Sequence, residues 1–321
     1  MYLLDSIQSV MENLEKDLIR QIQSHVPVAV EIGAHILQSG GKRIRPQMAV
    51  ISARMGGYDG TNVIKLSGAI EAIHTASLLH DDVIDDADTR RGLPAANTVW
   101  PNEMCIIAGD FLIARALSSL VSIGNMRILQ IVCKAAERLS EGELFQMKNI
   151  GNVDLTEKDY HQIVVDKTAV LMEVACRGGA ILGNLTSEQE EALAQFGYNL
   201  GIAFQMTDDV IDYKSEKAVM GKTPGNDLRE GKLTLPLIFA LKDATLDEKN
   251  KMTSMLQERQ SSDGDLEWVC EFLMKKGGIE KALEVSSRYL RTATEQLDIF
   301  PDSEEKRALQ KLADKILRRT Y

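Results

Sequence analysis

Asp81-Asp82-Val83-Ile84-Asp85 ends an apolar, helix-patterned segment, and Asp208-Asp209-Val210-Ile211-Asp212 repeats the same five residues 127 positions later. On a helix, residues four apart share a face, so the first and fifth aspartates of each copy point the same way. Clustered carboxylates repel one another unless cations lie between them. Mg²⁺ and Ca²⁺ suit oxygen ligands, and Mg²⁺ usually completes its shell with water and substrate phosphates. Two such helix ends facing each other predict a metal clamp for a diphosphate.

The composition is typical of a globular protein with a substantial core, since 44% of the 321 residues are hydrophobic and 26% are charged. A net charge of −10 argues against nucleic acid as the main partner. No apolar run reaches the roughly 18 residues of a membrane helix, so we expect no integral membrane segment. Met1 to Arg20 shows no signal or transit pattern, and four scattered cysteines have no metal-ligand spacing. These features predict a cytoplasmic protein with free thiols.

The order of residues predicts an all-α fold. No proline lies between Pro101 and Pro224, which permits a series of uninterrupted helices. Aromatic content is only 5%, and alternating strand patterns are scarce. Apolar residues recur at helical spacing in 64–79, 105–120, 126–139, 168–182 and 188–211. With no linker or shift in composition, we predict one domain, 1–321, built as a helical bundle.

The segment before the first motif predicts an apolar face that leads to its carboxylates. At about 100° per residue, Ser77, His74 and Ile70 fall within about 40° of Asp81, and Ile73 lies about 80° away. Ile70 and Asp81 are separated by roughly 16 Å along the helix. An ordinary core stripe with an acidic end remains the alternative. Carboxylates at a helix C-terminus oppose the helix dipole, however, which favours a function for them.

Basic segments lie beside both acidic motifs and predict a site for phosphate groups. They are Gly40 to Pro46 (GGKRIRP), Arg90-Arg91-Gly92 and the loop-like stretch Gly221 to Lys232. Arginine recognises phosphate oxygens with two hydrogen bonds, and lysine acts as a point charge. Each run by itself is typical of a solvated surface, but their positions favour binding. Asp166-Lys167-Thr168, taken alone, is interpreted as a helix cap.

His74 has three possible interpretations. A lone histidine on an apolar helix face is usually a hydrogen-bonded core residue. Its position two turns before Asp81 also makes a ligand role possible. Glu71 and His74 form the Glu-x-x-His element of di-iron bundles, but such sites need a second copy and further glutamates, and the sequence shows no second copy.

These stretches resemble the trans-isoprenyl diphosphate synthases, the polyprenyl synthetases, over essentially the full chain. The resemblance rests on the segments GGKRIRP (40–46), HTASLLHDDVIDDADTRRG (74–92), Lys167-Thr168 and FQMTDDVIDYKSEKAVMGKTPGNDLREGKLTLPL (204–237). Within the family, the chain is most similar to the bacterial long-chain enzymes, especially the octaprenyl type of quinone biosynthesis. The resemblance implies an all-α bundle around a deep central cavity, and a homodimer.

The resemblance also implies a role for each matching residue. Isopentenyl diphosphate is expected at Lys42, Arg45, His74 and Arg91. Mg²⁺, about three ions per active site, is expected at Asp81, Asp85, Asp208 and Asp212, with Asp82 and Asp209 in support. The allylic diphosphate is expected at Arg90, Lys167, Thr168, Gln205, Lys222 and Lys232. Catalysis is assigned to Asp81, Asp82, Asp85, Lys167, Asp208 and Lys222.

Chain length is expected to depend on residues beneath the first motif. Ala76 and Ser77 are small where short-chain members carry aromatics, so the tunnel is expected to continue along Ile73 and Ile70. This implies a product of about C40, made from farnesyl diphosphate and isopentenyl diphosphate. The alternatives are a catalytic subunit of a heteromeric hexaprenyl or heptaprenyl synthase, and a geranylgeranyl synthase. A terpene cyclase normally has a different second metal motif, and a non-catalytic subunit would lack carboxylates that this chain retains.

Overall fold

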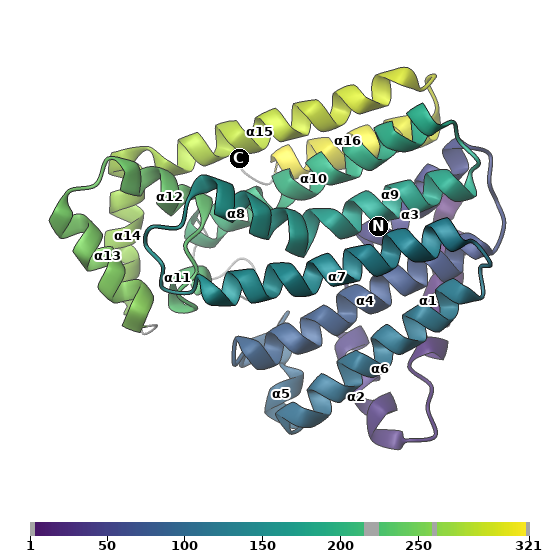
Figure 1. Cartoon of the computed structure of the whole chain (residues 1–321), viewed down its shortest axis with the longest axis horizontal. Helices are drawn as coiled ribbons and strands as arrows, with labels where there is room; N and C mark the ends of the chain where they lie inside the picture. The colour runs from purple at the N-terminus through teal and green to yellow at the C-terminus, as the bar shows by residue number, and fades with distance from the viewer. Residues whose placement is uncertain (1–3, 215–224, 259–261, 319–321) are drawn as a thin grey trace. The chain divides into compact units, whose positions relative to one another are not determined.

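The computed structural model of the chain describes residues 4–214, 225–258 and 262–318 (Figure 1). Helices dominate it. Among the described residues the strands are β1 (Thr89–Arg90) and β2 (Leu93–Pro94), which pair antiparallel directly after the first acidic motif. The predicted all-α class is therefore confirmed.

The helices follow one another with short connections, and the five segments predicted from the apolar period all lie within them. In chain order they are η1 (Asp5–Ile7), α1 (Gln8–Gln21), α2 (Pro27–Gln38), α3 (Ile44–Met55), α4 (Asn62–Ile84), α5 (Ala96–Val99), α6 (Asn102–Val121), α7 (Met126–Lys148), α8 (Glu157–Val164), η2 (Val165–Ala169), α9 (Val170–Leu182), α10 (Ser187–Lys214), α11 (Asn226–Arg229), α12 (Leu235–Lys242), α13 (Leu246–Glu258), α14 (Asp263–Lys276), α15 (Gly278–Glu295), η3 (Gln296–Ile299) and α16 (Glu304–Arg318).

Contacts between Cα atoms divide the chain into two compact units. Unit 1 comprises Met1–Ala136, Leu171–Gly197 and Gln296–Leu312, and unit 2 comprises Glu137–Val170, Tyr198–Glu295 and Ala313–Tyr321. The first acidic motif belongs to unit 1 and the second to unit 2. The single domain and the deep central cavity that we expect from the sequence stay predictions.

Unit 1 is built around α4, which packs against α1, α3 and α6. The core cluster beside the first motif contains Ala76 and Leu79 of α4 together with Cys105 and Leu112 of α6. Gly109 of α6 leaves room for the imidazole of His80 on α4, because a Cβ atom there would collide with its Nε2. This packing holds the last turns of α4, and with them the first acidic motif.

Unit 2 has a separate core, in which α12 packs against α14 and α15. Its hydrophobic cluster reaches Met206, Val210 and Tyr213, which lie on the part of α10 that carries the second motif. The same cluster includes Tyr160 of α8. Apolar side chains on one side of α10 therefore fix the orientation of its aspartates.

A π-helical turn lies between α8 and α9. The α8 helix begins with a capping box, in which the Thr156 side chain accepts a hydrogen bond from the backbone N–H of Asp159 and the Asp159 side chain accepts one in return. The chain then continues through the π turn η2 into α9 without a break. Turns of this kind are rare and frequently lie at functional sites. Here the turn carries Lys167 and Thr168.

By length and composition alone, α6 could cross a membrane. Its two sides differ, however. Cys105, Ala108 and Leu112 are buried in unit 1, whereas Met104 and Ile107 are exposed. Arg115 also donates from Nε to the backbone oxygen of Gln21 at 3.0 Å, which ties α6 to the end of α1. Thus α6 is a packed helix of unit 1 with one apolar face left uncovered.

Candidate active site

The first acidic motif divides its aspartates by exposure. Asp81 and Asp85 are partly exposed at the end of α4, whereas Asp82 is completely buried. Arg90 on β1 donates from Nε to both carboxylate oxygens of Asp82, at 2.7 and 2.9 Å, and its Nη2 lies 2.6 Å from Oδ1. Asp82 therefore anchors the hairpin that follows the motif, whereas the first and fifth aspartates are partly exposed.

A group of cations gathers in the same unit. Gly41 makes room for it, because a Cβ atom there would lie 2.9 Å from Arg91 and 3.3 Å from Arg43. Arg43 is neutralised by Glu15 and Glu71, each at 2.9 Å. Arg45 differs, since its Nε is buried and has no hydrogen-bond partner among the described residues. A buried donor of this kind is costly unless a ligand accepts from it.

His74 lies among these guanidinium groups. Burial lowers the pKa of His74 well below its usual range, and the positive charges of Arg45 and Arg91 lower it further. The imidazole is therefore neutral near pH 7 and offers one donor and one acceptor. The structure thus brings Arg45 and Arg91 near His74 in unit 1, and their role in binding isopentenyl diphosphate stays a prediction. Lys42 is exposed, and its backbone oxygen accepts from Gln47 at 2.7 Å.

The second acidic motif shows the same division. Asp208 and Asp212 are partly exposed, and Asp209 is buried. The hydroxyl of Tyr160 donates to Oδ2 of Asp209 at 2.5 Å, and Nε2 of Gln205 donates to Oδ1 at 2.8 Å. Burial raises the pKa of Asp209 to about 7, although the hydrogen bonds from Tyr160 and Gln205 act in the opposite direction. Both oxygens of Asp209 are thus occupied inside the protein.

The segment that begins at Gly225 packs on the end of α10. The backbone N–H of Gly225 donates to the backbone oxygen of Asp212 at 3.0 Å, and that of Asp227 donates to its Oδ2 at 3.1 Å. Lys232 Nζ lies 2.5 Å from Glu230, and its backbone N–H donates to Asp227 at 2.8 Å. Lys232 is therefore brought near the second motif. Lys222 lies outside the described residues.

The π turn supplies two further predicted residues. Lys167 contacts Glu143 and Gln146 of α7. Thr168 donates from Oγ1 to Oε1 of Gln205 at 2.9 Å. The interpretation of Asp166-Lys167-Thr168 alone as a helix cap is wrong, because these residues lie inside a continuous helix. Thr168 and Gln205 are thereby connected to Asp209 of the second motif, and their contact with the allylic diphosphate stays a prediction.

The residues expected to set chain length lie on α4, in the turns that precede the first motif. Ile70, Ile73 and Ala76 are buried, and Ser77 is partly exposed. The Ser77 hydroxyl donates to the backbone oxygen of His74 at 2.8 Å. These facts agree with a small, accessible wall at Ser77, and the role in chain length stays a prediction.

The donor set of each motif fits Mg²⁺. In 4–214, 225–258 and 262–318 no group of three or more His, Cys, Asp or Glu side chains is placed to hold a metal ion by itself. Mg²⁺ does not need one, because it is usually bound by one or two carboxylates together with water and substrate phosphates. Asp81 with Asp85, and Asp208 with Asp212, each provide such a pair. Glu71 is paired with Arg43, which does not favour the di-iron alternative.

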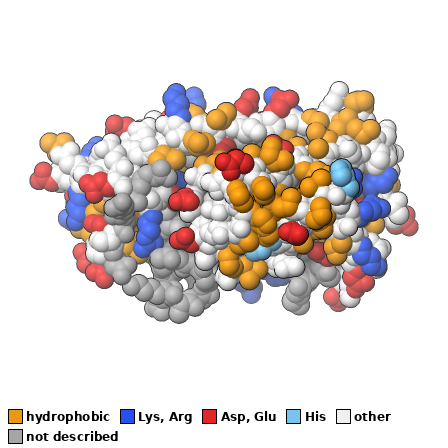
Figure 2. All heavy atoms as spheres, turned by 90° about the horizontal axis from the view of Figure 1, so that it is seen from below, with side chains coloured by type: hydrophobic (Ala, Val, Ile, Leu, Met, Phe, Trp, Pro, Cys, Tyr) orange, Lys and Arg blue, Asp and Glu red, His pale blue; other side chains and the backbone are white. Residues whose placement is uncertain are grey.

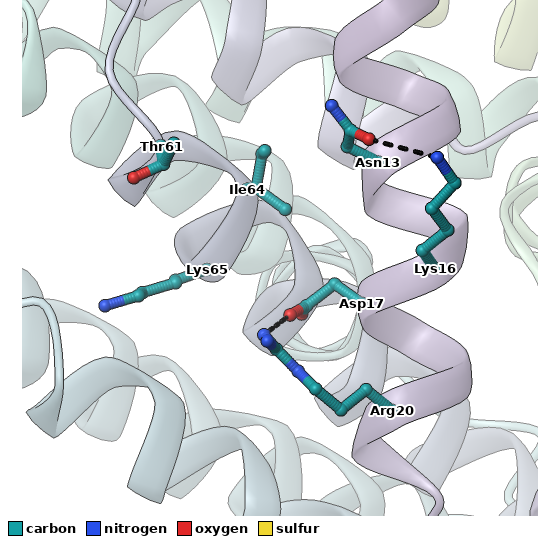
Figure 3. Close-up of a pocket in the computed structure, with 7 residues that line it drawn as sticks. All are labelled: Asn13, Lys16, Asp17, Arg20, Thr61, Ile64 and Lys65. Atoms are coloured by element: carbon teal, nitrogen blue, oxygen red, sulfur yellow. Dashed lines mark hydrogen bonds and ion pairs between the residues drawn. The ribbon is translucent and has the colours of Figure 1, made fainter.

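A hollow of about 410 Å³ opens elsewhere in unit 1, between α1 and the start of α4 (Figure 3). Arg20 contacts Asp17 there, and Lys16 Nζ lies 3.4 Å from Asn13. Lys65 in its wall stands 16 residues before Asp81, which is about 24 Å along α4. Because its principal charges already interact and the motif is distant, this hollow is not the predicted site.

The sequence of this chain matches the model of a known protein family. The model of the family described as polyprenyl synthetase matches residues 26–273. An octaprenyl diphosphate synthase of Haemophilus influenzae is 37% identical over 99% of this chain and 98% of its own length. A heptaprenyl diphosphate synthase component 2 of Geobacillus stearothermophilus is 35% identical over 100% and 98%.

Solved structures similar to this one come from the same family as the relatives found by sequence. A decaprenyl diphosphate synthase from Rhodobacter capsulatus has a TM-score of 0.94 at 36% identity and covers 99% of this chain and 98% of its own. A polyprenyl synthase from Caulobacter crescentus, in complex with calcium and isoprenyl diphosphate, has a TM-score of 0.94 at 34% identity and covers 99% and 97%. The all-α isoprenoid synthase fold is thereby shown, and the named products differ in length.

Proposed function

This chain belongs to the polyprenyl synthetase family and is a prenyltransferase, and we propose that it adds isopentenyl diphosphate repeatedly to farnesyl diphosphate to give about C40 octaprenyl diphosphate. The observation that carries the proposal is the pair of acidic motifs, in which the first and fifth aspartates are partly exposed and the second is buried. The name of the Haemophilus influenzae relative supports the octaprenyl length. We further propose that the enzyme is cytoplasmic and that its product supplies quinone side chains.

We assign the two substrates to different groups of residues. Asp81, Asp85, Asp208 and Asp212 would hold the Mg²⁺ ions of the allylic diphosphate. Lys167, Thr168, Gln205, Arg90, Lys232 and Lys222 would contact the same diphosphate. Arg45, Arg91, Lys42 and neutral His74 would hold isopentenyl diphosphate. The unpartnered Nε of Arg45 supports this assignment, because a phosphate oxygen would satisfy it.

The reaction requires three events in order. First, the bond between the allylic carbon and the diphosphate oxygen breaks and leaves an allylic carbocation. The double bond of isopentenyl diphosphate then attacks this carbocation. Finally, a proton leaves the adduct. Bound Mg²⁺ would supply Lewis-acid stabilisation of the departing diphosphate. The arginines and lysines would stabilise the same negative charge by preorganised hydrogen bonds. The apolar side of α4, at Ile70 and Ile73, would exclude water from the cation. We assign the departing proton to the released diphosphate.

Incubation of the purified chain with Mg²⁺, labelled isopentenyl diphosphate and farnesyl diphosphate tests the proposal. We expect prenyl alcohols of about C40 after the diphosphate is removed, and no product when Mg²⁺ is chelated. A cyclic hydrocarbon, or no consumption of isopentenyl diphosphate, would contradict it. Products near C20 would support the geranylgeranyl alternative instead.

A catalytic subunit of a heteromeric heptaprenyl synthase is the second candidate. The similarity to the Geobacillus stearothermophilus protein favours it, since that protein is named component 2 of a heptaprenyl diphosphate synthase. The two candidates differ in what the chain does alone. Activity of the purified chain without any partner supports the first, and activity only after addition of a second component supports the other.

We also propose that the enzyme is a homodimer formed through α6. Met104, Ile107, Phe111, Ala114, Ser118 and Val121 follow one another at alternating intervals of three and four residues along its uncovered face. This spacing is typical of helices that pack against a second helix. Figure 2 looks from the side where Figure 1 draws α5 and α6, and it shows apolar side chains gathered on that face. A second copy would cover them.

A further inference from the structure

We infer that Tyr160 is a positioning residue for the second metal site, acting through Asp209. The inference rests on the metal roles proposed above and extends them to a side chain that lies outside both acidic motifs. Tyr160 is on α8, 49 positions before Asp209, and both residues belong to unit 2. Its ring lies in the hydrophobic core of that unit, so only the hydroxyl is available for polar contact.

Asp209 joins two structural elements by hydrogen bonds. Its Oδ2 accepts from Tyr160 at 2.5 Å and its Oδ1 accepts from Gln205 at 2.8 Å. Oε1 of Gln205 in turn accepts from Thr168 at 2.9 Å. A continuous chain of three hydrogen bonds therefore runs from α8 through α10 to the π turn.

The burial of Asp209 and Tyr160 makes their hydrogen bond difficult to replace. Asp209 is 3% exposed and Tyr160 is 4% exposed, so water cannot readily replace a lost partner. A buried carboxylate whose donor is removed must find another donor or carry the desolvation cost. On α10 the available response is a rotation of Asp209 or of the helical turn that also carries Asp208 and Asp212. Either movement would misplace the two partly exposed carboxylates.

The first motif provides an independent parallel within unit 1. Asp82 occupies the same position in its motif, is completely buried, and is held by Arg90 through both carboxylate oxygens. In both motifs the second aspartate is thus an internal anchor, while the first and fifth are partly exposed. The partners differ in chemistry, because Arg90 is a cation and Tyr160 is a neutral donor. The role of Tyr160 follows from this arrangement and not from any sequence motif.

Tyr160→Phe removes the hydroxyl and keeps the ring in the core. Loss of a hydrogen-bonding partner behind a metal ligand typically lowers metal affinity or activity by 10- to 100-fold. We therefore expect the variant to need about tenfold more Mg²⁺ for its half-maximal response. The probe is Mg²⁺ added at a fixed concentration of inorganic diphosphate, and the readout is the rise in Tm. The Mg²⁺ dependence of prenyl transfer is measured beside it.

Tyr213→Phe is the matched control. Tyr213 is also buried, lies next to the motif on α10, and uses its hydroxyl on Thr234 at 3.2 Å rather than on a motif aspartate. We expect this variant to keep the wild-type Mg²⁺ midpoint within about twofold, even if its ligand-free Tm falls. Equal Mg²⁺ midpoints in Tyr160→Phe and wild type, or equal changes in both tyrosine variants, would overturn the inference.

A double variant shows whether Tyr160 acts through Asp209. If it does, adding Tyr160→Phe to Asp209→Asn changes the Mg²⁺ midpoint no further. Additive changes would contradict this. A wild type that shows no Tm response to Mg²⁺ and diphosphate would overturn the inference together with the proposed metal roles. A normal response in a chain that transfers no prenyl group would contradict only the proposed function.

Discussion

The aspartates within each acidic motif lie in different environments although their side chains are identical. Asp82 and Asp209 are buried and fully engaged by neighbours, whereas Asp81 and Asp208 are partly exposed. The same substitution is therefore expected to have different consequences at adjacent positions. At the accessible positions it should affect turnover, and at the buried positions it should also affect stability.

Asp81→Asn tests the accessible position and Asp82→Asn the buried one. We expect Asp81→Asn to lower kcat by about 10²- to 10³-fold with little change in Tm, because it weakens the hold on the Mg²⁺ that would stabilise the departing diphosphate. Asp82→Asn should lower the free energy of unfolding by about 1.5–3 kcal/mol, because it weakens hydrogen bonds from a charged donor. Steady-state kinetics and urea denaturation measure the two effects. Near-normal turnover in Asp81→Asn would contradict the proposed metal role.

His74 predicts a pH dependence of stability. Burial and the neighbouring guanidinium groups lower its pKa in the folded state, whereas the unfolded chain titrates near pH 6.5. The unfolded state therefore binds more protons as the pH falls below about 6.5, and stability is lost in that direction. The raised pKa of Asp209 has the opposite sign. Comparison with His74→Gln isolates the histidine.

We expect the Tm of wild type to fall more than that of His74→Gln between about pH 7.5 and about pH 5.5. Thermal denaturation in buffers of constant ionic strength measures both curves. Curves that stay parallel over this range would show that His74 takes up its proton equally in the folded and unfolded states.

At the scale of elements, the apolar period was sufficient for the main helices, because it is a local property of the sequence. It placed 64–79 in α4 and 188–211 in α10. The π turn could not be predicted in this way, since it depends on how α8 and α9 join. Tyr160 was missed for a related reason. An aromatic residue on an amphipathic helix is usually core, and its hydrogen bond reaches a residue 49 positions away.

The site residues show the same limit. The spacing of four residues predicted that the first and fifth aspartates share a face, and both are partly exposed in each motif. The anchoring of Asp82 by Arg90 was not predicted, because Arg90 was expected at the allylic diphosphate. Whether Arg90 also serves that role stays a prediction. Which of several nearby carboxylates an arginine binds depends on tertiary geometry, and the sequence alone does not give that geometry.

Product length is a property of the α4 helix. Ser77 is partly exposed one turn before Asp81, so a phenylalanine there is expected to close the space beneath the first motif. We predict that Ser77→Phe shortens the product to about C15 to C20 while the protein keeps its Tm. Mass analysis of the product alcohols measures the length. Unchanged length in Ser77→Phe, together with shortening in Ala76→Phe, would place the wall at Ala76 instead.

At the scale of the whole molecule, the uncovered face of α6 could lie in a membrane or in a subunit interface, and the pattern of its residues distinguishes the two. A membrane helix is apolar on all sides, whereas a subunit interface needs one apolar stripe. In α6 the stripe from Met104 to Val121 is exposed except at Phe111, which is partly exposed, and the opposite side is packed in unit 1 with Cys105 and Leu112. The helix also contains Asp110 and Arg115, which a membrane interior disfavours. The interface is the better explanation.

Ile107→Glu tests this interface at its most exposed apolar position in the first half of α6. Ile107 is 64% exposed in the single chain, and two-fold symmetry would place two substitutions in each dimer. Loss of about 1.5–3 kcal/mol per isoleucine gives about 3–6 kcal/mol, which weakens the dimer by about 10²- to 10⁴-fold. Sedimentation velocity at micromolar concentration should show a monomer. Leu246→Glu on α13, where the side chain is 73% exposed, is the control and should leave the dimer intact. A monomeric wild type, or a dimeric Ile107→Glu protein, would exclude α6 as the contact between copies.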